Sequence, residues 1–380
     1  MELLQAETPL EREQMLKRLV TNFDEVGWRH DRTQTVPIEN IEVLRKSGYA
    51  GLAVGEAYGG AGISLHELLT LQELIAREDG PTALSIGWHM GTMYQERTEK
   101  NWSEDNRETI LHDVVKKGFL LNTAATEKAT GSPTRGGQFQ TTAQIKNHQW
   151  VLNGEKTFYT LVEELDYYLV LATIEEDAST GMFLVEKGAA GVEIDRTWDM
   201  VSMGSTGSHD LILRNVTVPE QALLKIQEKG SPQAWLLHIP ACYLGIGYAA
   251  IQEASRYAKE YAPNSLGKPI ATIPAVRQKL GEAYLLYQQS HTVLYGIAKQ
   301  WDGSSNEERA LMRLPLMMAK HAVVQKAMQM VDLAMKVVGA QSLSHQSPLS
   351  RYYRNVRAGL HNPPMDDQTV EVAAAALLNE

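Results

Sequence analysis

Cysteine is almost missing from this chain: Cys242 is the only one among 380 residues, so an intramolecular disulfide is excluded. This scarcity suits a reducing compartment, and we expect a cytoplasmic protein. Basic residues are in deficit as well, with 36 Lys and Arg against 46 Asp and Glu, a formal net charge of −10. A general nucleic-acid-binding surface needs basic stripes, so we expect no nucleic-acid partner.

Long apolar runs are missing too. No stretch of the sequence approaches the roughly 18 consecutive apolar residues of a membrane-spanning helix, so we expect no membrane partner. The start is acidic and polar, unlike a signal peptide. Neither C-x-x-C nor H-E-x-x-H occurs in the sequence, and no metal site is predicted. What is present is an ordinary globular composition, 43% hydrophobic and 22% charged.

Hydrophobic spacing divides the chain into three parts. Residues 1–117 and 227–380 show apolar residues at helical intervals, for example Leu244, Tyr248 and Ile251. Residues 118–226 instead carry short alternating runs separated by turn residues, with no helices between them. The sequence therefore predicts an α+β, mostly α fold: an N-terminal helical domain, a middle antiparallel β domain and a C-terminal helical bundle.

Two local patterns lead to specific expectations. Strands are predicted over Phe139–Ile145 and Trp150–Leu152, joined across Lys146–Gln149. Asn153-Gly154, a strong turn signal, is expected to form a turn directly afterwards. Gly245–Ala250 fits the dinucleotide pattern G-x-G-x-x-A, but it lies inside a helical stripe and no βαβ unit follows. We therefore interpret those glycines as positions of close helix packing. Further strands are predicted at Tyr167–Thr173, Gly181–Val185, Gly191–Ile194 and Leu211–Val218.

Three segments carry the most specific information: Leu121–Ser132, Trp150–Thr160 and Met203–Pro219. In the first, a Gly131-Ser132 turn can offer backbone amides to an anion, and small residues such as Ala125 let the backbone approach a flat ring. In the second, alternation is expected to place Phe158 and Thr160 on one face of a strand. In this order and spacing, the three segments resemble the flavin-binding middle domain of the acyl-CoA dehydrogenase family.

The resemblance extends over nearly the whole chain and implies a cofactor, FAD or alternatively FMN, between the β domain and a C-terminal four-helix bundle. It implies that Phe158 covers one side of the flavin and that the Thr160 hydroxyl bonds near flavin N5. Gly339 and Ala340 stand where the family has a glycine-rich loop that contacts FAD, often across a subunit interface, so a homotetramer or dimer is expected. The predicted cofactor-binding residues are Thr123, Ala125, Thr126, Gly131, Ser132, Phe158, Tyr159, Thr160, Gly339 and Ala340.

The sequence departs from the family where most dehydrogenases keep their catalytic glutamate. Counting from Arg354, that place falls on Pro363. The base has either moved nearby, to Asp366, Asp367 or His361, or the chain belongs to the flavin-monooxygenase branch, which it resembles in Leu360-His361. Asp366 and His361 are the predicted catalytic residues. His89, Ser132 and His238 are predicted to contact substrate, although each histidine has the plainer alternative of a core or surface residue.

Three hypotheses about function remain open. The first is an acyl-CoA dehydrogenase that forms an α,β-double bond in an acyl thioester and passes electrons to an electron-transfer flavoprotein, with a role in fatty acid metabolism. The second is a two-component monooxygenase that acts on a small aromatic or sulfur compound and receives reduced flavin from a flavin reductase. The third is a flavin- or CoA-binding protein without catalysis.

Overall fold

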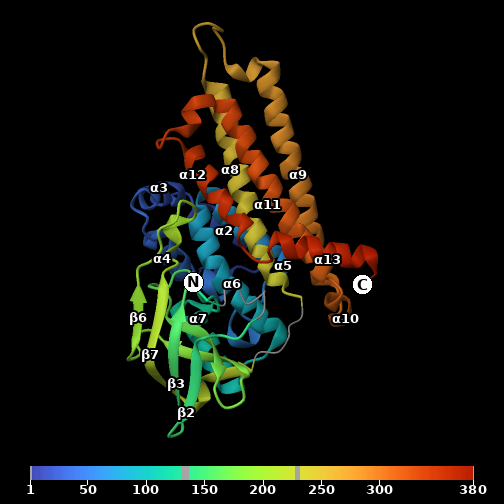
Figure 1. Ribbon diagram of the computed structural model, residues 1–380. Coiled ribbons are helices and arrows are strands. Elements are labelled where there is room, and N and C mark those ends of the chain that lie inside the picture. Colours follow the sequence, from blue (N-terminus) through green and yellow to red (C-terminus); the bar gives the residue numbers. More distant parts are fainter. Residues whose placement is uncertain (1, 130–136, 227–231, 380) are drawn as a thin grey trace.

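The computed structural model describes residues 2–129, 137–226 and 232–379, and it shows a sheet below an upright bundle of long helices, with shorter helices packed between them (Figure 1). The predicted order of helical, sheet and helical parts is confirmed. Gly131 and Ser132, two of the predicted flavin-binding residues, lie outside the described residues.

The N-terminal part is helical, and side-chain caps set several of its helix starts. Thr8 and Glu11 form a reciprocal capping box at α2, Ser64 caps α5, and Asp79 caps α6. Helix α6 is buried along most of its length and lies between the sheet and the bundle. The helices are α1 (Glu2–Gln5), α2 (Pro9–Leu19), α3 (Phe23–Thr33), α4 (Ile38–Ser47), α5 (Leu65–Glu78), α6 (Gly80–Glu99) and α7 (Glu104–Lys117).

The middle part is one eight-stranded sheet with strand order β6-β7-β3-β2-β4-β5-β8 and β1 beside β4. Most pairs are antiparallel, as predicted, but β4 runs parallel to both β1 and β2. The expected strands are present, and β1 and β8 were not predicted. The strands are β1 (Leu121–Ala124), β2 (Thr142–Lys146), β3 (Gln149–Lys156), β4 (Tyr167–Ile174), β5 (Thr180–Glu186), β6 (Val192–Asp195), β7 (Asp210–Pro219) and β8 (Leu223–Ile226).

The predicted turn at Asn153-Gly154 is wrong. Both residues lie inside β3. The hairpin between β2 and β3 turns at Asn147 and His148, whose φ angles are +51° and +60°, within the predicted connection Lys146–Gln149. The pairing of β3 with β7 shifts register at Gly154, which has a φ of +151°. A Cβ atom there would lie 2.5 Å from the Thr141 hydroxyl, so the glycine serves a bulge rather than a turn.

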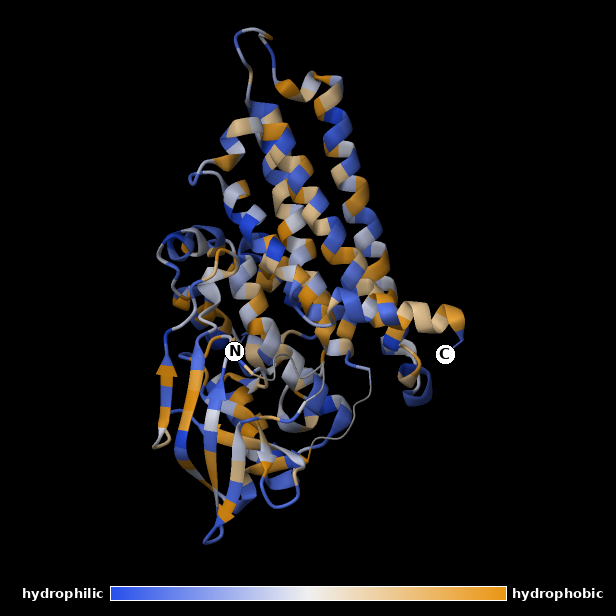
Figure 2. Ribbon diagram, in the orientation of Figure 1, coloured by the Kyte–Doolittle hydropathy of each residue, from blue (hydrophilic) through white to orange (hydrophobic). Residues whose placement is uncertain are grey.

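The C-terminal part is a bundle of α8 (His238–Glu260), α9 (Pro274–Gly303), α11 (Arg313–Val338) and α12 (Pro348–Val356), with the short α10 (Asn306–Ala310) at one end. Helix α8 is its centre and also packs against α5. Residues Ala234–Glu260 are long and apolar enough to cross a membrane by length and composition alone. However, 89% of their apolar 18-residue window is buried inside the protein, which is typical of a core helix. The mostly apolar α13 (Asp366–Leu378) extends sideways from the bundle (Figure 2).

The G-x-G-x-x-A pattern in α8 serves helix packing, as expected. A Cβ on Gly245 would lie 2.5 Å from the Glu73 carbonyl oxygen of α5, and a Cβ on Gly247 would lie 2.9 Å from the Met330 sulfur of α11. Only glycine lets the backbones approach this closely. The pattern is therefore not a dinucleotide site.

Candidate functional site

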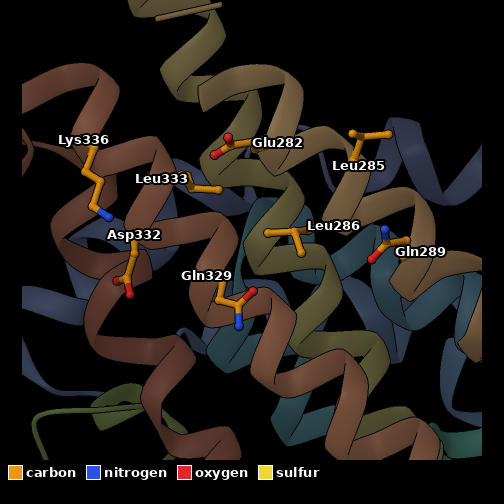
Figure 3. A pocket seen from close by; sticks show the side chains of 8 residues that line it. All are labelled: Glu282, Leu285, Leu286, Gln289, Gln329, Asp332, Leu333 and Lys336. Atoms are coloured by element: carbon orange, nitrogen blue, oxygen red, sulfur yellow. The ribbon is translucent and has the colours of Figure 1, made fainter. Parts of the chain in front are cut away.

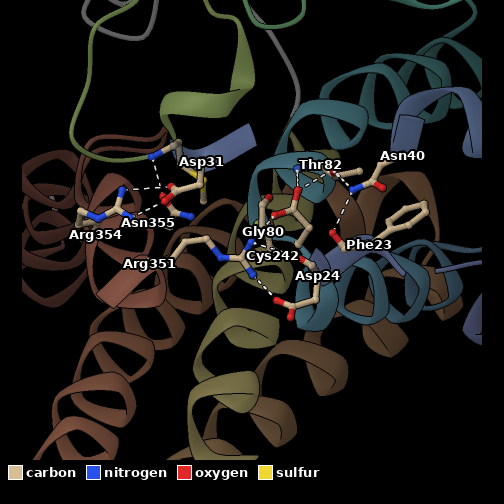
Figure 4. A network of polar contacts seen from close by, with 12 residues as sticks. Phe23, Asp24, Asp31, Asn40, Gly80, Thr82, Cys242, Arg351, Arg354 and Asn355 are labelled. Carbon is tan, nitrogen blue, oxygen red and sulfur yellow. Dashed lines mark hydrogen bonds and ion pairs between the residues drawn. The ribbon is translucent and has the colours of Figure 1, made fainter. Parts of the chain in front are cut away.

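Helix α12 fixes the three parts of the chain to one another (Figure 4). Arg351 pairs with the Asp24 carboxylate of α3 and lies 3.6 Å from Asp79 at the start of α6. One turn further along α12, Arg354 pairs with Asp31 of α3 at 2.5 Å. This junction holds α12 against α3 and the start of α6, so the residues that follow α12 begin from a fixed position.

The same helix is hydrogen-bonded to the loop before β7. The side-chain oxygen of Asn355 accepts a hydrogen bond from the backbone N–H of Met203 at 2.9 Å, and the Ser202 hydroxyl donates to the Asn355 carbonyl at 3.1 Å. Met203 adopts a left-handed backbone with φ +53°, a costly conformation for a residue other than glycine. Such strain persists where the surroundings impose it, and here the amide of Asn355 does so.

The segment after β3 does not continue as a strand. Strand β3 ends at Lys156, and Phe158 has a left-handed backbone with φ +56°, so strand alternation does not position Phe158 and Thr160 as predicted. The bend leaves the Phe158 side chain 53% exposed, with its ring edge-on to Trp198 at 5.6 Å. A large apolar ring held outward in a strained backbone is a candidate ligand contact.

Thr160 is buried next to two other hydroxyl groups. Its Oγ1 lies 3.0 Å from the Ser208 Oγ, which lies 2.8 Å from the Thr206 Oγ1. The Thr206 hydroxyl donates to the Met203 carbonyl at 2.9 Å. Among the described residues, the neighbouring Ser205 hydroxyl is buried without a hydrogen-bond partner. Ser205, Thr206 and Ser208 were not among the predicted site residues, although three hydroxyl residues within four positions were an available signal.

The other predicted cofactor-binding residues of the middle part differ in whether their side chains remain available to a ligand. The Tyr159 side chain is buried, and its hydroxyl donates to the Asn122 carbonyl at 2.6 Å, so it supports the core rather than a ligand. Thr123, Ala125 and Thr126 are half-buried on β1 and directly after it. The Thr126 carbonyl accepts from the Thr157 N–H at 2.9 Å, which joins this segment to the bend after β3.

Gly339 and Ala340 end α11 on the surface. Gly339 has a φ of +73°, and no atom lies within 4 Å of where its Cβ would be. Both residues are exposed, so they are free to contact a group outside this chain. A groove lies elsewhere, between α9 and α11 (Figure 3). It is lined by Glu282, Leu285, Leu286, Gln289, Gln329, Asp332, Leu333 and Lys336.

Comparison with known proteins supplies the family. Acyl-CoA dehydrogenase domain models match all three parts: the N-terminal domain at residues 11–117, the middle domain at 122–216 and the C-terminal domain at 237–360. The Bacillus subtilis protein named "Putative acyl-CoA dehydrogenase YdbM" is 44% identical over 361 residues, which cover 94% of each chain. This chain belongs to the acyl-CoA dehydrogenase family.

Other relatives show how widely the family's reactions vary. The 3-(aryl)acrylate reductase of Clostridium sporogenes is 26% identical, with 91% of this chain and 93% of that protein covered. Two solved structures share the fold at lower identity. Butyryl-CoA dehydrogenase from Megasphaera elsdenii has a TM-score of 0.84 at 22% identity, covering 96% of this chain and 98% of that one. TdsC from Paenibacillus, in complex with FMN and indole, has a TM-score of 0.86 at 21% identity, covering 96% of each.

The two catalytic candidates of this family member lie in different surroundings. Asp366 begins α13, where its carboxylate lies 3.1 Å from Lys320 and 2.9 Å from the Gln325 amide. Burial acts to raise the pKa of Asp366, but the Lys320 ammonium outweighs it and holds that pKa below its usual range. A carboxylate stabilised in this way is a weak base. His361 is exposed at the end of a short 3₁₀ turn, Arg357–Leu360.

The two buried histidines also differ from each other. His89 accepts from the Leu121 N–H through Nδ1 at 3.2 Å and donates from Nε2 to the Ala50 carbonyl at 3.0 Å, which leaves no ring nitrogen for a substrate. His238 donates from Nδ1 to the Trp235 carbonyl at 2.9 Å, and its Nε2 has no partner among the described residues. Burial lowers the pKa of each to about 4, so both rings are neutral near pH 7.

His238 belongs to an aromatic cluster on one face of α6. Its ring lies edge-on to Trp88 at 5.0 Å and stacks on Trp235 at 6.0 Å. A Cβ on Gly91 would lie 2.5 Å from the Trp235 ring, so glycine on α6 makes room for the cluster. Trp88 and Trp235 are partly exposed and offer an aromatic surface, whereas the His238 ring, with its unpartnered Nε2, is buried. Neither tryptophan was predicted.

Proposed function

We propose that this protein is a flavin-dependent oxidoreductase of the acyl-CoA dehydrogenase family that oxidises an acyl-CoA thioester to its α,β-unsaturated form. The observation that carries the flavin assignment is the exposed Phe158, held two residues before the buried Thr160 hydroxyl. A flat ring resting on Phe158 fits this arrangement, with a polar atom of the ring near Thr160. The backbone around Thr126 would border the same ring.

The cofactor would be FAD, with FMN as the alternative, and it would supply two-electron redox chemistry. The chain's own residues would hold and orient it. Phe158 would cover one face, and Thr160 would meet N5. The unpartnered Ser205 hydroxyl is a further polar group close to Thr206 that lacks a protein partner. The solved complex of TdsC with FMN supports a flavin cofactor. The relatives named as acyl-CoA and butyryl-CoA dehydrogenases support a CoA thioester as substrate.

We place the substrate against the aromatic cluster of Trp88, Trp235 and His238. The partly exposed rings of Trp88 and Trp235 suit an acyl chain or an aromatic group, and the buried Nε2 of His238 would accept a hydrogen bond only from a substrate group that enters the core beside it. The dehydrogenase assignment rests on the 44% identity to YdbM and on the relatives that act on CoA thioesters. Electrons would pass to an electron-transfer flavoprotein.

A specific observation favours a second candidate, a two-component flavin monooxygenase. Pro363 stands at the expected position of the glutamate, and the nearby Asp366 is already paired with Lys320. His361 is then the remaining candidate for proton transfer close to the end of α12. A histidine there, with a separate flavin reductase as partner, suits an enzyme that oxygenates a small aromatic or sulfur compound.

The deciding experiment is an anaerobic titration of the flavin-loaded protein with acyl-CoAs of several chain lengths. We expect the visible flavin band to bleach with at least one of them, because a dehydrogenase reduces its flavin with substrate. An unbleached band, in a protein that consumes oxygen when given chemically reduced flavin, would replace the dehydrogenase by the monooxygenase. If the protein binds flavin but shows neither bleaching nor oxygen consumption, the remaining hypothesis is a binding protein without catalysis.

His361 provides the matched mutational test. We expect His361→Ala to keep bound flavin and to lose turnover by about 10²-fold or more, the usual effect of removing a group that transfers protons. His148→Ala is the control, because His148 is an exposed histidine at the β2–β3 turn. Turnover close to that of the unmodified protein in both variants would make His361 a surface residue.

We also propose that a second copy of this chain covers the groove between α9 and α11. The groove combines apolar Leu285, which is 62% exposed, with charges of both signs, Glu282 and Lys336, so one copy can complement another across a two-fold axis. Light scattering gives the mass in solution, and a monomer at all concentrations would contradict the proposal.

A further inference from the structure

The hydroxyl groups of Thr160, Ser208 and Thr206 form a continuous chain that ends on a backbone carbonyl. The successive separations are 3.0 Å from Thr160 Oγ1 to Ser208 Oγ, 2.8 Å to Thr206 Oγ1 and 2.9 Å to the Met203 carbonyl oxygen. All three side chains are buried. These three contacts are therefore shielded from bulk water.

The direction of this chain is determined by its end. A carbonyl oxygen only accepts, and each hydroxyl has one hydrogen to donate. Three contacts and three hydrogens allow one arrangement in which every contact is a hydrogen bond: Thr206 donates to Met203, Ser208 donates to Thr206, and Thr160 donates to Ser208. The Thr206 hydroxyl is also the nearest donor to that carbonyl, since the Trp198 ring N–H is 3.1 Å away and the Thr206 backbone N–H is 3.2 Å away.

The chain is held from both sides. Asn355 of α12 fixes Met203 through its backbone N–H at 2.9 Å. The Leu161 N–H donates to the Thr206 carbonyl at 3.0 Å, and the Tyr159 N–H donates to the His209 carbonyl at 3.2 Å. These bonds link the bend that contains Thr160 to the loop that contains the other two hydroxyls. If the three hydroxyls donated in the opposite direction, the hydrogen bond from Thr206 to the Met203 carbonyl would be lost. The Thr160 hydrogen would then have no acceptor among these three groups.

We infer that Thr206 and Ser208 are positioning residues that make Thr160 a hydrogen-bond acceptor, and that this site consequently binds reduced flavin more tightly than oxidised flavin. The inference rests on the proposed function, in which flavin N5 lies against Thr160. Flavin N5 carries a hydrogen when the ring is reduced and only a lone pair when it is oxidised. With its own hydrogen committed to Ser208, Thr160 matches the reduced form and offers the oxidised form no donor.

The test compares dissociation constants for oxidised and chemically reduced flavin, measured anaerobically with both FAD and FMN, and the midpoint potential of the bound flavin. Thr206→Val keeps the side-chain shape and removes the terminal hydroxyl, so Ser208 can donate to Thr160 and release the Thr160 hydrogen toward the flavin. We expect the preference for reduced flavin to fall by about tenfold, the scale of one net hydrogen bond. That change equals a drop of about 30 mV for a two-electron couple.

Two further variants separate the possible outcomes. Thr206→Ser restores the hydroxyl and should restore the preference, whereas Ser208→Ala frees Thr160 and should act like Thr206→Val even if the valine variant folds poorly. Thr160→Val tests the premise, and an unchanged preference there would overturn the placement of N5 in the proposed function. If Thr160→Val changes the preference while Thr206→Val and Ser208→Ala do not, the placement stands and the inferred polarity is overturned.

Discussion

Replacing Arg351 by methionine is expected to lower the free energy of unfolding by about 3–5 kcal/mol, the usual cost of removing one partner from a buried ion pair. Arg351 is 3% exposed and faces Asp79, which is 1% exposed, as well as Asp24. Methionine fills much of the same space but leaves Asp79 without a compensating charge. Burial already raises the pKa of Asp79, and the arginine is the main opposing influence. Urea denaturation at pH 7 measures the loss.

Arg357→Met is the matched control for this prediction. Arg357 is on the same segment and pairs with Asp332 at 2.6 Å, but the two side chains are 32% and 42% exposed. Exposed pairs contribute about 0–1 kcal/mol. The double variant Arg351→Met with Asp79→Asn should recover part of the loss, since the uncompensated charge is removed. Equal effects of Arg351→Met and Arg357→Met would show that burial of the first pair contributes nothing.

The junction around α12 connects stability to the proposed site. Arg351, Arg354 and Asn355 lie within five positions, and they bind α3, the start of α6 and the loop at Met203. His361 follows only six residues after Asn355. Beyond it, the Asn362 side chain accepts from the Tyr243 hydroxyl of α8 at 2.5 Å. Loosening α12 would therefore disturb the Thr160 hydroxyl chain and the His361 segment together.

The order of the three parts could be predicted from the sequence because hydrophobic spacing reports which faces are buried. Its failures have local causes. Asn153-Gly154 has the composition of a hairpin turn, but the register of β3 against β7 places it in a bulge, and a pairing between strands 60 residues apart is not visible in a local pattern. The bend at Phe158 was missed for a similar reason, since an aromatic residue in the sequence does not indicate a left-handed backbone.

The candidate site was predicted unevenly. Phe158 and Thr160 were named from their place in a family segment, while their partners Trp198 and Ser208 come from other segments that only the fold brings together. Asp366 was also named from its position in the sequence, but there the structure argues against the predicted role. Its position near the missing glutamate made it a candidate base, but its partner Lys320 lies 46 residues away on α11. A carboxylate's role depends on such neighbours, and they follow from helix packing rather than from sequence distance.

The second large effect is expected from lowering the pH, through His89 and His238. Burial lowers the pKa of each to about 4, against 6.5 for an exposed histidine. Between pH 4 and pH 6.5 each histidine is protonated in the unfolded chain but neutral in the folded protein, so protonation favours unfolding. Stability is therefore complete above pH 6.5 and declines as the pH falls toward 4. The loss is on the order of 3 kcal/mol for each histidine.

Variants isolate the contribution of the histidines from that of the acids. Burial raises the pKa of Glu96, like that of Asp79, and a raised carboxyl pKa changes stability with pH in the opposite direction. The comparison must therefore be between proteins rather than between pH values alone. His89→Gln should lose stability at pH 7, because it breaks the bonds to Ala50 and Leu121, yet its free energy of unfolding should fall less steeply from pH 6.5 to 4.5. His148→Gln, at an exposed turn, should keep the original slope. A slope unchanged in His89→Gln would mean that the folded protein protonates His89 as readily as the unfolded chain does, which contradicts an Nδ1 that accepts from the Leu121 N–H.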